Sequence, residues 1–242
     1  KPIIIRIPLG SLTGVDKELL SVAKIVDGKL VFQGGFVDGN TIVESRDAFS
    51  SYVVVENKVS FNDLAKVQSW AGRQIEVVAA KGAIEGKKAG VFAPSDNVTR
   101  AEFAKMLIKA LDLDNVKATE SFSDVQASDW FAQYVAAASQ NGIINGRTDT
   151  EFAPNATITR AEMATMIARA LKAKRNLQDV ADVDGALEGF SDAAQIHSTL
   201  KAGVAFAADK GLIIGNNGKF LPNDNATRAE AAVILYRTIN FK

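Results

Sequence analysis

A four-residue motif, Thr-Arg-Ala-Glu, occurs three times in this 242-residue chain, beginning at Thr99, Thr159 and Thr227. A threonine followed three residues later by a glutamate is typical of a capping box, in which each of the two side chains accepts a hydrogen bond from the other residue's backbone N–H. We therefore expect a helix to begin at each copy, with the threonine as its N-cap residue. Capping accounts for the threonine and the glutamate, but not for the arginine.

The arginines of the motif, Arg100, Arg160 and Arg228, stand in the first turn of each expected helix. The positive end of the helix dipole makes a cation mildly unfavourable there. Two interpretations are open from the chemistry alone. In one, the arginine is solvated or pairs with a nearby carboxylate, such as the aspartate of a Phe-x-Asp motif. In the other, the guanidinium and the first-turn amides together hold an anion such as a carboxylate or phosphate.

Two tryptophans bear on this choice, because Trp70 and Trp130 both precede a helix-ending glycine by twelve residues. An indole beside an arginine offers a flat apolar face for a sugar ring and a free N–H donor. The alternative is that both tryptophans are core residues. In the third copy the same position is Thr199, which predicts that the third site, the one assigned to Arg228, is altered or lost.

The Thr-Arg-Ala-Glu motif is the last part of a longer repeat, and the other residues of that repeat stand at similar distances from it in each copy. Each copy opens with Phe-x-Asp, reaches a glycine, carries a second glycine four residues later, and then has Phe-x-Pro five residues before its threonine. The successive threonines are 60 and 68 residues apart, and the extra eight residues fall in a polar linker between Lys172 and Gly189. The aspartates are Asp63, Asp124 and Asp192, and the second glycines are Gly86, Gly146 and Gly215.

Apolar positions with helical spacing lie on both sides of each Gly/Pro loop. Counting back from the first glycines, Gly82, Gly142 and Gly211, positions −11, −7 and −4 are apolar in every copy, which predicts an amphipathic helix ended by a left-handed glycine. Positions +4, +7 and +8 from each motif threonine are apolar too. Each unit is therefore helix, loop, helix, and because one such pair cannot bury both stripes, we expect the three units to pack together.

Residues 1–60 have a different composition, with short runs of β-branched and aromatic residues around 3–7, 29–32 and 52–55. The dipeptides Asp27-Gly28, Gly34-Gly35 and Asp38-Gly39 separate them and are typical of turns. We expect two or three hairpins here. So few strands seldom stand alone, so they pack on the helices or complete another domain.

Composition excludes several classes of function. The 28 basic and 28 acidic residues give zero net charge, which argues against a nucleic-acid partner, and no apolar run approaches the roughly 20 residues of a membrane helix. The chain has no cysteine, no nucleophile elbow and no phosphate-binding loop, and its one histidine, His197, reads as an ordinary helix residue. We expect no enzyme, no cofactor and no metal site, and we interpret the acidic stretch Asp179 to Gly185 as linker.

The repeated Phe-x-Asp, Trp, Gly-x-x-x-Gly, Phe-x-Pro and Thr-Arg-Ala-Glu resemble the S-layer homology (SLH) domain, and the resemblance covers residues 61–242. It implies a mainly α fold, with three helix–loop–helix SLH units in a pseudo-threefold arrangement around a central helical bundle, preceded by a small N-terminal β segment. The expected divisions are a β-rich segment at 1–60, SLH repeat 1 at 61–120, repeat 2 plus linker at 121–189, and repeat 3 at 190–242.

The resemblance also implies a function: non-covalent anchoring at the C-terminal end of a secreted, Gram-positive surface protein in the cell wall or S-layer. The expected partner is a peptidoglycan-linked secondary cell-wall polymer, bound through a pyruvylated sugar by a monomer, without membrane insertion. The implied roles are a grip on the carboxylate by Arg100, Arg160 and Arg228, packing on the sugar by Trp70 and Trp130, and shaping of the groove by Gly86, Gly146 and Gly215 with Asp63, Asp124 and Asp192. The alternatives are a helical-repeat scaffold for other proteins, or an accessory domain of a carbohydrate-active enzyme.

Overall fold

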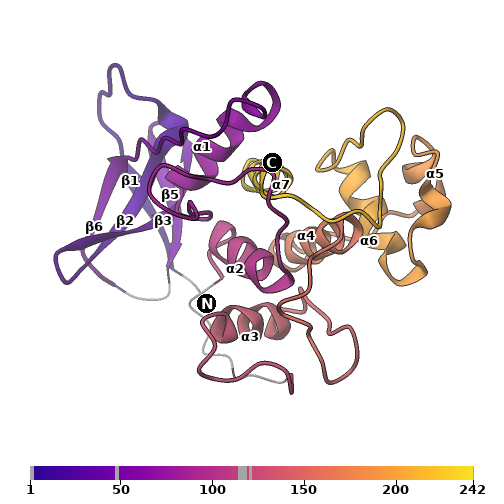
Figure 1. Cartoon of the computed structure of the whole chain (residues 1–242). Coiled ribbons are helices and arrows are strands. Elements are labelled where there is room, and N and C mark those ends of the chain that lie inside the picture. The colour runs from indigo at the N-terminus through magenta and orange to yellow at the C-terminus, as the bar shows by residue number, and fades with distance from the viewer. Residues whose placement is uncertain (1–2, 47–48, 114–118, 120–121, 242) are drawn as a thin grey trace.

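The computed structural model describes residues 3–46, 49–113, 119 and 122–241. A β unit of the first sixty residues lies beside a set of helices from the rest of the chain (Figure 1). None of the helices in the described residues is long and apolar enough to cross a membrane.

The β unit consists of two three-stranded antiparallel sheets with the strand orders β1-β5-β4 and β3-β2-β6. Its strands are β1 (Ile3–Pro8), β2 (Leu20–Val26), β3 (Lys29–Gly34), β4 (Phe36–Asp38), β5 (Thr41–Arg46) and β6 (Tyr52–Glu56). A hairpin between β2 and β3 turns at Asp27-Gly28, where both residues have positive φ, as a tight hairpin turn requires. A second hairpin joins β4 to β5 at Asp38-Gly39, so both turns expected from these dipeptides are confirmed.

The expected fold class, mainly α with a small β segment, is wrong. The structure is 37% helix and 19% strand, and its strands form two complete sheets. The sequence pattern underestimated the β content because β2 and β5 are the central strands of their sheets. Leu20 to Ala23 and Ile42 to Glu44 are buried in unbroken runs, without the alternation of buried and exposed residues that marks a half-exposed strand.

The three repeats supply an inner and an outer set of helices, with a short linker helix, α5 (Val183–Leu187). The inner helices are α2 (Arg100–Ala110), α4 (Arg160–Arg175) and α7 (Arg228–Ile239). The outer helices are α1 (Arg73–Ala80), which continues a π-helical turn at Gln68–Gly72, α3 (Ala132–Gln140) and α6 (Ser198–Asp209), which follows a 3-10 turn at Ala193–Gln195. A further 3-10 turn, Lys17–Leu19, precedes β2.

The expected helix ends are confirmed in all three repeats. Each inner helix has its threonine as N-cap and a complete capping box, through Glu102, Glu162 and Glu230. Each outer helix is followed by its glycine in the left-handed region, with φ of 74° at Gly82 and 67° at both Gly142 and Gly211.

The helices pair between repeats, in a cyclic order. Outer helix α3 packs on α2, α6 packs on α4, and α1 packs on α7 (Figure 1). Each outer helix therefore lies against the inner helix of the preceding repeat, and the first repeat is preceded by the third. The repeats close into a ring, and the apolar stripe of each helix is buried against a helix of another repeat.

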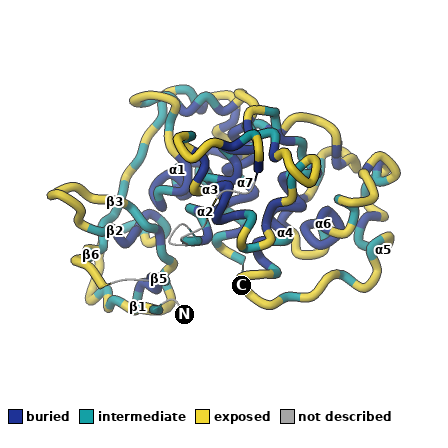
Figure 2. Tube along the Cα trace, turned by 90° about the horizontal axis from the view of Figure 1, so that it is seen from below, coloured by how far each residue is buried: buried dark blue, intermediate teal, exposed yellow. Residues whose placement is uncertain are grey.

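A second ring, made of backbone, lies just before the three inner helices. The N–H of Val98 donates to the carbonyl of Ala226, Ala226 donates to Ile158, and Ile158 donates to Val98, at 2.9–3.0 Å. All three side chains are fully buried, within the buried interior that Figure 2 shows around the inner helices. This cycle explains why the residue before each motif threonine is apolar.

The β unit packs on the ring of repeats through charged and polar contacts. Arg73 of α1 is within 2.7–2.8 Å of the carboxylates of Asp16 and Glu18, and the hydroxyl of Tyr236 in α7 donates to Glu18 at 2.6 Å. Of the two alternatives for this segment, the structure shows packing on the helices.

Candidate binding grooves

Three grooves occupy equivalent places around the ring, and each is lined by all three repeats. One repeat supplies its motif arginine, the next supplies the second glycine and the inner helix, and the following one supplies the residue at the tryptophan position. We name each groove by that last residue.

The members of each groove follow from this rule. The Trp130 groove contains Arg228, Gly86, Lys87, Glu102, Lys105 and Trp130, in a cavity of about 290 Å³. The Trp70 groove contains Arg160, Gly215, Asn216, Glu230, Arg237 and Trp70, in about 500 Å³. The Thr199 groove contains Arg100, Gly146, Arg147, Glu162, Arg169, His197 and Thr199, in about 780 Å³.

The motif arginine reaches from its own helix into the next repeat. Arg100 donates through Nε to the carbonyl of Phe152 at 2.9 Å and through Nη2 to the carbonyl of Asn145 at 3.3 Å. Its Nη1 lies 2.8 Å from Glu162, the capping glutamate of the next repeat, and its guanidinium carbon lies 4.7 Å from the centre of the Phe152 ring. We call this set of contacts a seam, since it joins two repeats.

The other two arginines form seams of the same kind, but Arg228 donates to the backbone carbonyls of Phe92 and Glu85, whereas Arg100 and Arg160 also pair with a glutamate side chain. Arg160 donates to the carbonyl of Phe220 at 2.8 Å and pairs with Glu230. Arg228 donates to the carbonyl of Phe92 at 2.9 Å, with its guanidinium 4.7 Å from that ring. The pairing interpretation is therefore correct for Arg100 and Arg160, but the partner is the glutamate of the next motif, not the aspartate of Phe-x-Asp.

Two of these arginines are deeply buried. Arg100 and Arg228 are each only 4% exposed, whereas Arg160 is half-buried. Burial lowers the pKa of the Arg100 and Arg228 guanidinium groups, and nearby carboxylates, Glu162 and Glu102 respectively, oppose that shift. Each guanidinium has five N–H donors, so the three bonds of Arg100 do not exhaust its capacity.

The aspartates of Phe-x-Asp hold the Phe-x-Pro loop of their own repeat. The carboxylate of Asp63 accepts hydrogen bonds from the N–H groups of Phe92 and Ala93 at 2.9 and 2.7 Å, and Asp124 and Asp192 make the equivalent pairs. The loop needs this support because Ala93 has a left-handed φ of 58°, which costs free energy for a non-glycine residue. Of the described residues that line the grooves, none is one of these aspartates.

These bonds also affect the aspartates' pKa values. Burial alone would raise the pKa of Asp63 and Asp192, but the two backbone N–H groups that each accepts outweigh it and lower the pKa. The carboxylates are thus structural supports behind the groove.

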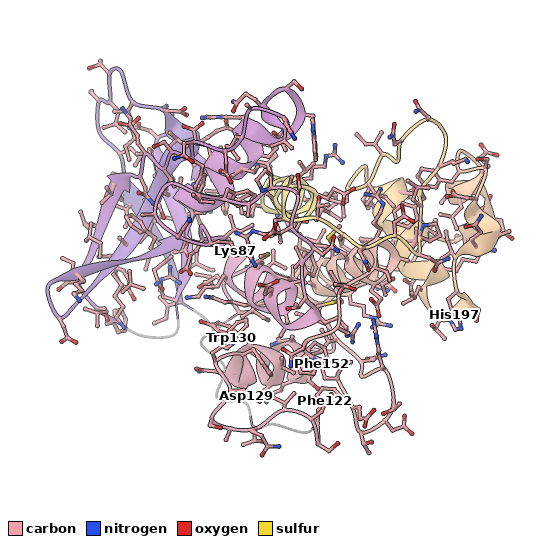
Figure 3. The ribbon with its side chains drawn as sticks, in the orientation of Figure 1. Lys87, Phe122, Asp129, Trp130, Phe152 and His197 are labelled. Carbon is pink, nitrogen blue, oxygen red and sulfur yellow. The ribbon has the colours of Figure 1, made fainter. Side chains whose placement is uncertain are left out.

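The second glycines allow close packing inside the loop. A Cβ atom at Gly146 would lie 2.1 Å from the carbonyl oxygen of Thr148 and 2.9 Å from the ring of Phe122. That ring in turn packs against Phe152, with centroids 5.6 Å apart, and Figure 3 shows the two side by side. Gly86 and Gly215 meet the same kinds of atoms at 2.6–2.9 Å, so glycine is a steric requirement in all three repeats.

The tryptophans are not core residues, because Trp70 is 47% exposed and Trp130 is 56% exposed. Lys105 of α2 lies with its ammonium 5.8 Å from the centre of one Trp130 ring, and Figure 3 shows Lys87 and Trp130 on either side of α2. Each indole therefore presents a face at the edge of a cation-lined groove.

The pairing of arginines with tryptophans differs from the expectation based on the repeat. Trp70 shares a groove with Arg160, and Trp130 shares one with Arg228. The groove without a tryptophan is the one that contains Arg100, not Arg228. The cyclic offset between repeats is the reason, since each groove combines residues from three copies.

Cationic side chains on the groove rims were not predicted from the sequence. They are Lys87, Lys105, Arg147, Arg169 and Arg237. Arg169 and Arg237 both stand ten residues after a motif threonine, and Lys87 and Arg147 both directly follow a second glycine. An alignment of the copies for charge, in addition to identity, would have found these two positions.

Comparison with known proteins gives one family. A family model described as the S-layer homology domain matches residues 60–104, 121–164 and 189–232, more than half of the chain. The chain is 36% identical over 208 residues to an amylopullulanase of Thermoanaerobacterium thermosulfurigenes, covering 85% of this chain and 11% of that protein. It is 38% identical over 184 residues to the exoglucanase XynX of Acetivibrio thermocellus, covering 76% and 16%.

A third relative is the surface-layer 125 kDa protein of Lysinibacillus sphaericus, 34% identical over 194 residues, covering 78% of this chain and 16% of that protein. The chain thus spans less than a fifth of the length of each of these relatives. The shared part is common to proteins with different names, as is expected of a module combined with different partner domains.

Proposed function

Because this chain belongs to the S-layer homology domain family, we propose that it anchors its parent protein by binding an anionic, pyruvylated secondary cell-wall polysaccharide in the grooves between its repeats. The family and its surface-layer relatives establish the coarser part: the chain is a cell-surface, cell-wall-associated anchoring domain. The identity of the wall component, and the residues that hold it, are the proposal.

The observation that carries the proposal is an exposed indole that lines the same groove as a motif arginine. Trp70 with Arg160, and Trp130 with Arg228, each combine a flat apolar surface and a guanidinium. A sugar ring stacks on the first, and a carboxylate on that sugar accepts hydrogen bonds from the second. The combination suits a saccharide that carries an acid group.

Cations outnumber carboxylates in both tryptophan grooves: Arg228, Lys87 and Lys105 against Glu85 and Glu102 in one, and Arg160 and Arg237 against Glu230 in the other. Lys105 lies over the Trp130 ring, Lys87 lines the same groove, and Arg237 lines the groove of Trp70. Such a local field favours a polyanion although the whole chain is neutral. On this basis we assign the carboxylate sites to the Trp130 and Trp70 grooves. Arg228 and Arg160 then contribute to binding of the carboxylate, and Arg100 does not.

The proposal is tested by sedimentation with purified wall sacculi. Native sacculi should retain the domain, and sacculi stripped of the secondary polymer should not. Trp70→Ala combined with Trp130→Ala should reduce retention at least ten-fold, because both stacking faces are lost. The matched control is Phe49→Ala, since Phe49 is 87% exposed and lies outside the grooves.

Competition with monosaccharides then identifies the acid group. A pyruvylated amino sugar should displace the domain from sacculi, and the same sugar without pyruvate should not. Equal retention on stripped sacculi would instead point to peptidoglycan or a wall protein as the partner.

A further inference from the structure

The Thr199 groove differs from the other two in both its size and its side chains. It is the largest of the three, at about 780 Å³ against about 500 and about 290 Å³, and it has a threonine where the others have an indole. It has arginine both after the second glycine, Arg147, and ten residues after the motif threonine, Arg169. The corresponding residues of the Trp70 groove are Asn216 and Arg237.

Arg169 is a half-buried cation for which the described residues supply no hydrogen-bond or ion-pair partner. In the part of the chain that the structure describes, no carboxylate or carbonyl lies within hydrogen-bonding or ion-pair distance of its guanidinium. Burial lowers the pKa of the Arg169 guanidinium, as it lowers that of Arg237 at the equivalent position. Its equivalent, Arg237, donates to the carbonyl of Leu212 at 3.0 Å.

Arg147 is weakly engaged in the same groove. Its Nη2 lies 3.4 Å from the carbonyl of Thr157 and 3.4 Å from Glu162, both at the limit of a hydrogen bond. Glu162 is already paired with Arg100 at 2.8 Å. Two guanidinium forks from different elements, the loop after Gly146 and helix α4, therefore retain donors for an anion.

The rest of the groove mixes apolar side chains with polar ones and with the carboxylates of Asp149 and Glu162, which the cations Arg100, Arg147 and Arg169 outnumber. Thr199 presents a hydroxyl, which lies 2.8 Å from Nδ1 of His197 at the start of α6, and Figure 3 shows His197 at that end of the helix. Among the described residues that line this groove there is no tryptophan or tyrosine. A ligand here is held by charge and hydrogen bonds and not by stacking of a sugar ring on an indole.

We infer that the Thr199 groove binds a phosphoryl group, with Arg147 and Arg169 as its ligands. A phosphoryl group presents three acceptor oxygens in a tetrahedral arrangement and up to two negative charges, so two separate forks match it better than they match the two coplanar oxygens and single charge of a carboxylate. The inference deepens the proposed function, since it assigns this groove to phosphate carried by the wall polymer, but its ligand class differs from that of the two tryptophan grooves.

The test is calorimetry of the whole chain with N-acetylglucosamine 1-phosphate at pH 8, where a phosphomonoester is doubly charged because its second pKa is about 6. We expect saturable binding with one site. Arg169→Gln and Arg147→Gln should each weaken it about ten-fold or more, the loss of a charge-assisted pair. The matched control, Arg6→Gln on strand β1, removes an exposed arginine outside all three grooves and should change it less than about two-fold.

The other probes separate the chemistry from its carrier. Inorganic phosphate should bind with the same dependence on Arg169. Tighter binding of the sugar phosphate than of inorganic phosphate would indicate a group carried by a polymer. Equal binding of the two would indicate recognition of the phosphoryl group alone. Glucuronic acid, a carboxylate sugar, should bind at least ten-fold more weakly than the sugar phosphate. Absence of saturation, equal binding of glucuronic acid, or equal losses in Arg169→Gln and Arg6→Gln would overturn the inference.

The two proposals fail separately. If the tryptophan double variant loses wall binding but no phosphate binds, only the phosphate inference fails. If phosphate binds through Arg169 but sacculi retain the domain without their secondary polymer, only the proposed function fails.

Discussion

The seams between repeats share one arginine-to-carbonyl hydrogen bond, whereas the rims of the grooves differ in the residue after the second glycine and, in one groove, at the tryptophan position. In each seam an arginine donates through Nε to the phenylalanine carbonyl of the next Phe-x-Pro, at 2.8–2.9 Å. At the rims, the residue after the second glycine is Lys87, Arg147 or Asn216, and the tryptophan position holds Trp130, Thr199 or Trp70. The same three arginines belong to both regions, because each lies at the floor of a groove.

This difference teaches that recurrence of a residue in a repeat protein does not by itself mark a ligand contact. The seam repeats because closing a ring needs the same joint three times. The rim varies because three grooves can divide the recognition of a polymer among them. Variants in the two regions should therefore separate stability from binding.

The largest effect is expected in the seam, for Arg100→Ala. The change leaves the carbonyls of Phe152 and Asn145 without a donor and removes the buried partner of Glu162, which should lower the free energy of unfolding by about 3–5 kcal/mol. Urea denaturation of the variant measures this. A loss below about 1 kcal/mol would break the comparison, since the arginine would then be a rim residue like the others.

A smaller effect is expected for Asp192→Asn, behind the Phe-x-Pro loop. The amide retains one acceptor for the N–H groups of Phe220 and Leu221 but loses the other, so unfolding at pH 7 should become easier by about 1–3 kcal/mol. The exposed Asp149→Asn is the control.

The difference in unfolding free energy between the wild type and Asp192→Asn should depend on pH. The pKa of Asp192 is lowered in the folded state from an ordinary value of 3.8, despite burial, by the backbone N–H groups it accepts. The carboxylate's contribution is therefore fully present above about pH 4 and is lost as the pH falls through the folded-state pKa. The gap between the wild type and Asp192→Asn should shrink below pH 4, and a constant gap would show that geometry alone matters.

The smallest change in stability is expected at the rim, for Thr199→Trp. This position is exposed at the edge of a groove, so unfolding should change by no more than about 0.5 kcal/mol. The new indole should, however, give the third groove a stacking face worth about 0.5–1.5 kcal/mol, and one further equivalent of pyruvylated sugar should bind. Calorimetry reports the added equivalent, and a large loss of stability without it would place position 199 in the seam.

The residue spacing within a repeat predicted the local structure of that repeat. The three capping boxes, the left-handed glycines and the buried stripes follow from offsets along one helix or one turn, and all are confirmed. The contacts between repeats were not predicted, because the choice of partner helix depends on the cyclic offset, which leaves the spacing unchanged. For that reason Arg228 was matched with Thr199 in the sequence, although Thr199 lines the groove of Arg100.

The β unit was underestimated for a different reason. Only its edge strands β1, β3 and β6 carry runs that a pattern search finds, while its central strands β2 and β5 are buried on both faces. Among the predicted site residues, the tryptophans and arginines do line the grooves. The aspartates do not, because they support a loop behind the grooves.

The closed order of the repeats has a consequence for how the chain folds. Two seams join residues 52 and 60 positions apart, Arg100 with Phe152 and Arg160 with Phe220, but the third joins Arg228 to Phe92 across 136 positions. Long-range contacts form slowly, and helix α1 has no inner helix to cover it until α7 has been synthesised. The ring therefore cannot close until the last repeat has been synthesised, and until then α1 has the preceding β unit, not α7, as its packing partner.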